Sequence, residues 1–161
     1  MKKIVVVFLG LFIAISACKK DPVDPTEEKT NSELLTNGSS KTWKIKDGIA
    51  KQNGLEVNLI ASQNPCITDN LIKLFSDFSY EFTEGASKCN ANDPDLILKA
   101  TWAISADAKS ITIDRFIFLG RVVDKPVFVL SSVTETTFSG TTTLTVDNET
   151  FDLEVVFEEV K

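Results

Sequence analysis

The sequence contains no histidine, and this absence narrows the chemistry available to the chain. Histidine is the usual general base of Ser and Cys catalytic triads and the commonest zinc ligand, so neither kind of site is expected. The sequence also lacks a serine or cysteine catalytic motif, a phosphate-binding glycine loop and an arrangement of carboxylates suited to acid–base work. We therefore predict a protein that is not an enzyme and that holds no metal or cofactor.

Basic residues are outnumbered by acidic ones. The 161 residues include 17 Lys or Arg and 23 Asp or Glu, which gives a net charge of −6. Loss of Lys2 and Lys3 with the first 17 residues would bring the charge to −8. Nucleic-acid binding depends on basic side chains that replace counterions around phosphates, so no nucleic-acid partner is predicted. The length suits one domain.

One long apolar run exists, and it stands at the N-terminus. Two lysines follow Met1, and an apolar segment extends from Ile4 to Ile15 with one glycine inside it. The segment is shorter than the roughly 20 residues of a membrane-spanning helix. A short basic region before such a run is typical of a secretory signal, so residues 1–17 are predicted to be a signal peptide.

The end of this segment, Ile15-Ser16-Ala17-Cys18, resembles the lipobox of bacterial lipoproteins. The resemblance implies cleavage before Cys18 and attachment of lipid to its thiol, because two or three acyl chains anchor a protein stably. It therefore implies a lipoprotein of the bacterial cell envelope, held in the outer membrane on its periplasmic or surface-exposed side. The alternative is an ordinary secretory signal that ends in cysteine.

Residues 18–33 are predicted to form a flexible tether behind the lipidated cysteine. Proline, acidic and small polar residues dominate this stretch, and large apolar residues are nearly absent. Such a segment cannot bury enough apolar area to offset the entropy lost on ordering. The folded domain is expected over residues 34–161.

This domain shows period-two alternation of apolar and polar residues in short segments separated by turn signals, which favours an antiparallel sheet with one buried face. A short helix is expected near Ser32 to Leu35, and Thr68 to Leu74 is interpreted as a strand. The side chains expected to face inward are large and mostly aromatic. They are Trp43, Phe78, Tyr80, Phe82, Trp102, Phe116, Phe118, Phe128, Phe138, Phe151 and Phe157.

Cys66 and Cys89 remain once Cys18 carries lipid. An oxidising compartment favours a disulfide between them. Two free structural thiols are the alternative, and a metal site is disfavoured because two thiols without histidine do not make a four-ligand zinc site.

Several segments in order resemble the lipocalin-like lipoproteins of Bacteroidetes. They are Gly38-Ser39-Ser40-Lys41-Thr42-Trp43, Cys66-Ile67-Thr68-Asp69-Asn70, Lys88-Cys89 and Thr101-Trp102. The resemblance covers about residues 36–160. It implies an all-β, antiparallel up-and-down barrel of about eight strands, and its motifs do not identify a ligand. Together with the aromatic inner face, it supports the hypothesis that the domain binds a small apolar or amphipathic molecule.

Phe78, Tyr80, Phe82 and Trp102 are the candidate ligand-binding residues. Filling of the core is the ordinary role of such aromatic side chains. Tyr80 is expected near a barrel mouth, because its phenol needs water or a hydrogen-bond partner. The alternative function is a non-catalytic surface module that contacts a protein or a glycan, and the volume left inside the barrel discriminates between the two.

The lipobox generates the first testable prediction. Cys18→Ser removes the thiol that would carry the lipid, so the domain should leave the membrane fraction and appear in the soluble fraction of its host. Immunoblotting of fractions washed in high salt, with and without metabolic labelling by a palmitate analogue, checks this. A variant that still sediments with membranes after the wash would contradict lipid anchoring.

Overall fold

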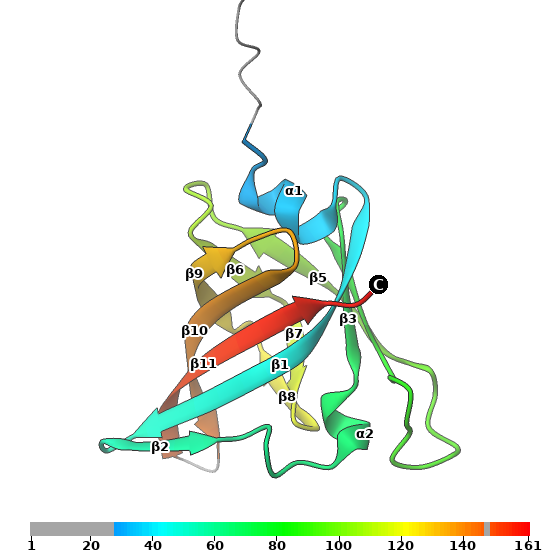
Figure 1. Cartoon of the computed structure of the whole chain (residues 1–161), viewed down its shortest axis with the longest axis vertical. Coiled ribbons are helices and arrows are strands. Elements are labelled where there is room, and N and C mark those ends of the chain that lie inside the picture. The colour runs from blue at the N-terminus through cyan, green and yellow to red at the C-terminus, as the bar shows by residue number, and fades with distance from the viewer. Residues whose placement is uncertain (1–27, 147–148) are drawn as a thin grey trace, which may run out of the picture.

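The computed structural model describes residues 28–146 and 149–161. The predicted signal peptide over 1–17, Cys18 and the tether as far as residue 27 lie outside the described residues. Across the described ranges, no helix has both the length and the apolar character that crossing a membrane requires. The elements in chain order (Figure 1) are α1 (Asn31–Thr36), β1 (Ser40–Gln52), β2 (Leu55–Asn58), α2 (Pro65–Thr68), β3 (Leu71–Phe75), β4 (Ser79–Thr83), β5 (Leu96–Ile104), β6 (Ser110–Ile113), β7 (Arg115–Phe118), β8 (Arg121–Asp124), β9 (Val127–Val133), β10 (Thr137–Val146) and β11 (Glu149–Glu159).

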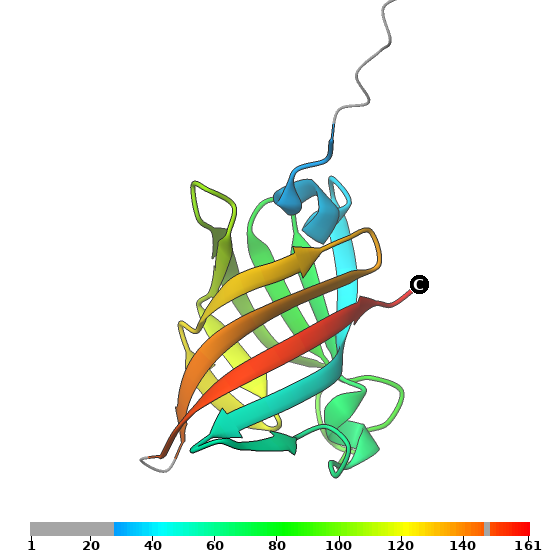
Figure 2. The same cartoon turned by 60° about the vertical axis from the view of Figure 1, so that its left-hand side comes forward.

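Eight strands form a closed antiparallel barrel (Figure 2). Around the ring the order is β1, β3, β4, β5, β6, β9, β10 and β11. Pairing of β1 with β11, from Trp43 opposite Glu159 to Lys51 opposite Asp152, closes the ring. Strands that follow one another in the chain are neighbours once β2 and the β7–β8 hairpin are set aside. The predicted up-and-down barrel of about eight strands is confirmed.

β1 changes its second partner part-way along its length. Residues Ser40–Lys44 pair with β3, whereas Ile49–Gln52 pair with β2. Between these segments a register shift at Ile45/Asp47 interrupts the pairing with β11, and such bulges bend a strand and increase its twist. β2 therefore extends the sheet outside the ring.

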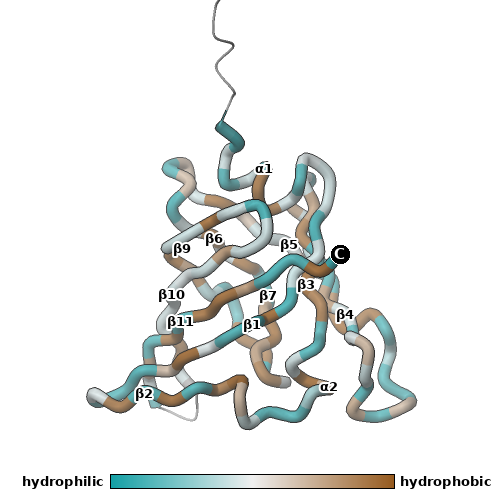
Figure 3. The backbone as a smooth tube through the Cα atoms, in the orientation of Figure 1, coloured by the Kyte–Doolittle hydropathy of each residue, from teal (hydrophilic) through white to brown (hydrophobic). Residues whose placement is uncertain are grey.

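Alternation along the strands places their apolar faces inside the barrel, and the tube in Figure 3 changes between teal and brown along β1 and β11. On β11, for example, Leu153, Val155 and Phe157 are buried. Most of the aromatic residues expected to face inward are buried, and Phe151 is half-buried against the same core. The buried ones are Trp43, Tyr80, Phe82, Trp102, Phe116, Phe118, Phe128, Phe138 and Phe157.

Phe78 does not face inward, so the prediction for this residue is wrong. β4 begins only at Ser79, and Phe78 lies in the preceding turn with a φ of 66° and 44% of its surface exposed. A left-handed backbone reverses the chain and breaks the alternation that links Phe78 to Tyr80 in the sequence. The strand expected from Thr68 begins instead at Leu71, because Pro65–Thr68 forms the short helix α2.

α1 covers one end of the barrel (Figure 1) and lies where a short helix is expected. A capping box starts it: Thr30 Oγ1 accepts the N–H of Glu33, and the Glu33 carboxylate accepts the N–H of Thr30. Leu35 enters the core with no exposed surface. Its carbonyl accepts the indole N–H of Trp43 at 3.0 Å, which fixes the helix to β1.

The buried side chain of Lys41 links α1 to the barrel strands at the same end. Only 5% of this residue is exposed, and its ammonium donates to the carbonyl oxygens of Leu34 in α1 and Glu135 in the β9–β10 turn. The carboxylates of Glu135 and Glu159 lie 3.9 and 4.0 Å from it, and the ring of Trp43 lies 4.8 Å away. One buried cation thus holds α1, β1 and the ends of β9 and β11 together.

The β7–β8 hairpin covers the opposite end. It forms its own two-stranded sheet and leaves the ring between β6 and β9, which lie across the barrel from β1. Phe116 and Phe118 are nevertheless buried, and a Cβ on Gly48 of β1 would lie 3.6 Å from Cζ of Phe118. The hairpin therefore leans across the barrel, and its Phe118 ring comes close to β1 at Gly48.

Trp43 tests the α1 end. We expect Trp43→Ala to lower the free energy of unfolding by about 3–5 kcal/mol, because it leaves a large cavity and removes the bond to Leu35. Trp43→Phe retains a ring against Phe138, whose centroid lies 4.8 Å from that of Trp43, and should cost less. Urea unfolding followed by circular dichroism measures both, and equal losses in the two variants would contradict the packing role of the ring.

Candidate functional site

The four side chains predicted to bind ligand do not line one accessible surface. Tyr80, Phe82 and Trp102 belong to the buried core, and Phe78 lies outside it. Phe78 packs against Trp102 with ring centroids 5.2 Å apart, and the indole N–H of Trp102 donates to the carbonyl of Phe75 at 3.0 Å. A ligand-binding role for these residues stays a prediction.

Tyr80 is fully buried, so the expectation that its phenol reaches water or a partner near a mouth is wrong. Within the described residues its hydroxyl oxygen has no hydrogen-bond partner. Burial raises the pKa of Tyr80, because the phenolate would lose its hydration inside the barrel. The hydroxyl therefore reduces the stability that the ring contributes.

A column of aromatic rings fills the barrel between its two covered ends. Successive ring centroids lie 4.3–6.4 Å apart, so each ring contacts the next. From the α1 end to the hairpin end the column consists of Trp43, Phe138, Phe157, Phe128, Phe116 and Phe118. These rings occupy interior space that a ligand inside the barrel would need.

A cleft of about 1000 Å³ opens on the side of the barrel between β8 and β10. Arg121–Asp124 form one wall, Thr141–Thr145 form the other, and Val127 and Val129 of β9 also line it. This volume lies at the upper end of the range for small-molecule sites.

The cleft exists because β9 and β10 stop pairing early. Their last paired residues are Thr141 and Val129, yet β10 continues to Val146 with β11 as its partner. At the last contact the strands nearly touch, since a Cβ on Gly140 would lie 3.0 Å from the carbonyl oxygen of Val129. Beyond it, Lys125 takes a left-handed φ of 49° where the hairpin turns away from the wall.

The cleft walls combine apolar and hydrogen-bonding groups. Val122, Val127 and Val129 are exposed by 57, 47 and 55%, and threonine hydroxyls lie along β10. Thr143 donates from Oγ1 to the carboxylate of Asp152 at 2.8 Å. Such a surface suits an amphipathic molecule. The charged lining residues are Arg121, Asp124, Lys125 and Asp152.

None of these cleft residues is identified by sequence reasoning. The run Thr141-Thr142-Thr143 is typical of a strand surface or a turn, and this pattern does not show where a strand loses its neighbour. The signal that could have found the site is the uninterrupted run Thr141-Thr142-Thr143-Leu144-Thr145-Val146, which has strand-forming residues and no charge.

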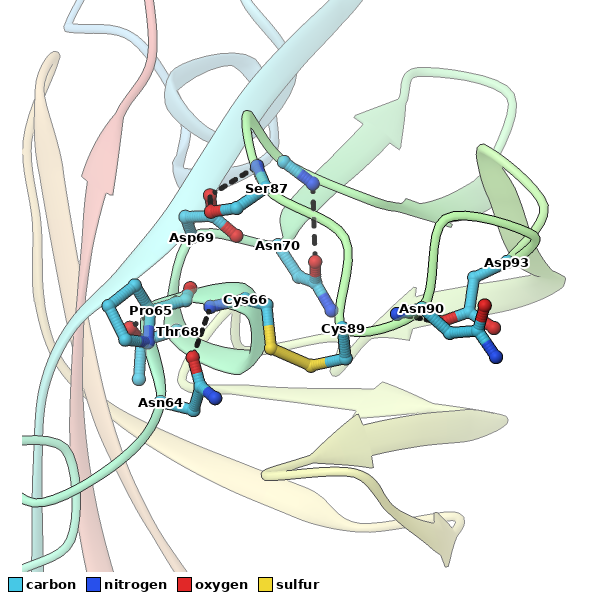
Figure 4. The surroundings of a disulfide bond; sticks show 11 residues. Asn64, Pro65, Cys66, Thr68, Asp69, Asn70, Ser87, Cys89, Asn90 and Asp93 are labelled. Atoms are coloured by element: carbon cyan, nitrogen blue, oxygen red, sulfur yellow. Dashed lines mark hydrogen bonds between the residues drawn. A yellow bond between two sulfur atoms is a disulfide. The ribbon is translucent and has the colours of Figure 1, made fainter.

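The predicted disulfide between Cys66 and Cys89 is present (Figure 4), with the two Cα atoms 5.1 Å apart. It ties α2 to the loop that precedes β5. Beside it the carboxylate of Asp69 accepts both the N–H and the hydroxyl of Ser87, at 2.9 and 2.6 Å, and the side chain of Asn70 accepts the N–H of Gly85. In the described ranges, no three acidic or sulfur side chains gather in a way that could hold a metal ion.

Tyr80 is the chain's one tyrosine, so its titration can be followed directly. Because its pKa is raised in the fold, it contributes stability that is present below the unfolded pKa of about 10 and lost as the pH rises above that value. Tyr80→Phe should match or exceed the wild type in stability at neutral pH and lose less stability in alkali. Urea unfolding of both proteins at neutral and alkaline pH, with phenolate absorbance for the wild type, checks this. A clear destabilisation by Tyr80→Phe at neutral pH would show that the hydroxyl has a partner.

Comparison with known proteins gives likenesses in structure only. No family model matches the sequence, and no curated protein matches it. Among solved structures, bovine odorant-binding protein in complex with a selenium-containing odorant is 13% identical with a TM-score of 0.46, covering 83% of this chain and 74% of that one. Transferrin-binding protein B of Haemophilus parasuis Hp5, a double mutant, is 12% identical with a TM-score of 0.40, covering 83% of this chain and 28% of that one. The barrel assignment rests on the strand order of this chain itself.

Proposed function

We propose that this chain is a lipid-anchored, non-catalytic binding protein of the bacterial cell envelope. The signal sequence over 1–17, the lipobox cysteine Cys18 and the polar tether over 18–33 support the anchor and the location. The disulfide is in keeping with an exported protein, since such bonds persist in oxidising compartments.

The β8–β10 cleft is the binding site in this proposal, and it is the single observation that carries it. The barrel interior is filled by the aromatic column, whereas the cleft is open and large enough for a small molecule. Three exposed valines gather there, and exposed apolar surface of this kind marks binding sites.

The ligand class that best fits these walls is a small apolar or amphipathic molecule. Its apolar part would cover Val122, Val127 and Val129, and a polar end would meet the threonine hydroxyls and the charged groups of Asp124 and Lys125.

Contact with another macromolecule is the second candidate function, favoured by the position of the cleft on the outer wall. The site then recognises a surface segment of a protein or a glycan rather than a free small molecule. The tether would let the domain reach such a partner from the membrane.

Val129→Lys tests the cleft as the binding site. A lysine in the apolar part of the cleft should weaken binding of a fluorescent fatty acid by about tenfold or more, which corresponds to about 1.4 kcal/mol. Val57→Lys is the matched control, because Val57 is also 55% exposed but lies on β2, away from the cleft. Fluorescence titration measures binding, and urea unfolding verifies that both variants fold.

Equal weakening by both substitutions would show that charge alone acts, which contradicts a cleft site. Absence of saturable binding by the wild type to fatty-acid and other amphipathic probes would shift the proposal to contact with a macromolecule.

A further inference from the structure

The main-chain groups of β10 can be assigned to its two edges. The N–H of Glu159 donates to the carbonyl of Thr136, which sets the phase of the hydrogen bonds between β10 and β11. In an antiparallel ladder such bonded pairs recur at every second residue, and the register here is continuous from Thr137 to Val146. Even-numbered residues such as Thr142 therefore bond to β11.

Odd-numbered residues of β10 direct their main-chain N–H and C=O groups to the other edge. Thr141 meets Val129 of β9 there, in the last pair of that ladder. Thr143 and Thr145 come after the strands separate, so no strand in the described part of the chain pairs with this edge of theirs. Their donors and acceptors face the cleft.

β8 presents a second strand edge on the other side. In the described part of the chain β7 is the one strand that pairs with β8, and Val122 and Asp124 line the cleft opposite Thr141–Thr145. The cleft is therefore a slot between two strand edges.

The unpaired part of β10 has no protection against strand addition within its own sequence, and the register shift with β9 lies before it, between Ser139 and Gly140. Natural edge strands are shielded by charge, proline, a bulge or a covering element. Thr142–Val146 contains no charged residue, proline or glycine. Edge strand β2, in contrast, is only four residues long and carries Glu56.

We propose that the β8–β10 slot binds an extended segment of another polypeptide, which adds to β10 as a strand. The inference rests on the cleft as the proposed binding site and names its partner class. Main-chain hydrogen bonds to Thr143 and Thr145 supply affinity, and alternate side chains of the segment pack on Val122 and Val129. A single extended segment has two free edges, whereas the edge strand of a folded sheet has one.

A synthetic peptide tests this with intact wild-type protein. The probe is a dye-labelled peptide of four Thr-Val repeats, and the control is the same peptide methylated at alternate amide nitrogens. We expect saturable binding by fluorescence anisotropy, with the methylated peptide weaker by about tenfold or more because it lacks donors on one edge.

Substitution of Thr143 tests the edge from the side of the protein. Thr143→Pro removes the N–H that faces the cleft and leaves the bonds between β10 and β11 in place, and proline is tolerated where an N–H is not used in a ladder. Thr143→Val keeps that N–H, and both variants lose the same hydroxyl bond to Asp152. Peptide binding should be lost in Thr143→Pro and restored in the conservative variant.

Every outcome of these experiments either supports or contradicts strand addition to β10. Equal binding of the two peptides, or no peptide binding at all, would overturn strand addition. Titration of Thr143→Pro with the fluorescent fatty acid separates strand addition from the proposal that the cleft binds a small molecule. A small molecule held by the valines should still bind to this variant. If the wild type binds the peptide and not the fatty acid, strand addition stands and the small-molecule proposal fails.

Discussion

Pairing between β1 and β11 turns a meander of strands into a closed ring, and the rest of the domain is arranged around the interior that this closure creates. An eight-stranded barrel is just wide enough for side chains to fill it. The aromatic column does so from Trp43 to Phe118, and α1 and the β7–β8 hairpin cover its ends. A strand with the length of β1 can close the ring and still pair with β3 above and β2 below, because its bulge changes direction between the two.

The position of the β7–β8 hairpin accounts both for the covered end of the barrel and for the cleft on its side. β6 and β7 are nearly continuous in the chain, as are β8 and β9, so the hairpin could have extended the wall. It leans inward instead, where Phe116 and Phe118 meet the core and the tip approaches Gly48. The wall beside β10 consequently ends early, and the cleft occupies the place that the hairpin has left. One local departure from regular pairing thus fills the interior and creates the candidate site.

Much of this fold follows from sequence alone because the signals are local. Alternation identifies the strands and most of the core, and the exported context favours the bond between Cys66 and Cys89. Phe78 shows the limit: its spacing from Tyr80 fits a strand, and only the left-handed turn places it outside. The alternation of Phe116 and Phe118 likewise predicts inward side chains but cannot show that they arrive across the barrel end. The cleft depends on which strands cease to pair, a non-local property that no residue of β10 displays by itself.

The barrel interior and the β8–β10 cleft differ in what a ligand must displace before it can bind. Access to the interior requires displacement of one of the two end covers, and at the hairpin end the re-exposure of Phe116 and Phe118 costs roughly 1.5–3 kcal/mol for each ring before any contact is gained. The cleft requires no such rearrangement, because its valines are already exposed and Thr143 and Thr145 lie in its lining. A molecule that covers the valines gains free energy from apolar burial. A molecule that also offers main-chain hydrogen bonds would continue the ladder along β10 beyond Val129, where its pairing with β9 ends. The hydrogen-bonding pattern of the cleft therefore favours an extended backbone over a purely apolar ligand of the same size.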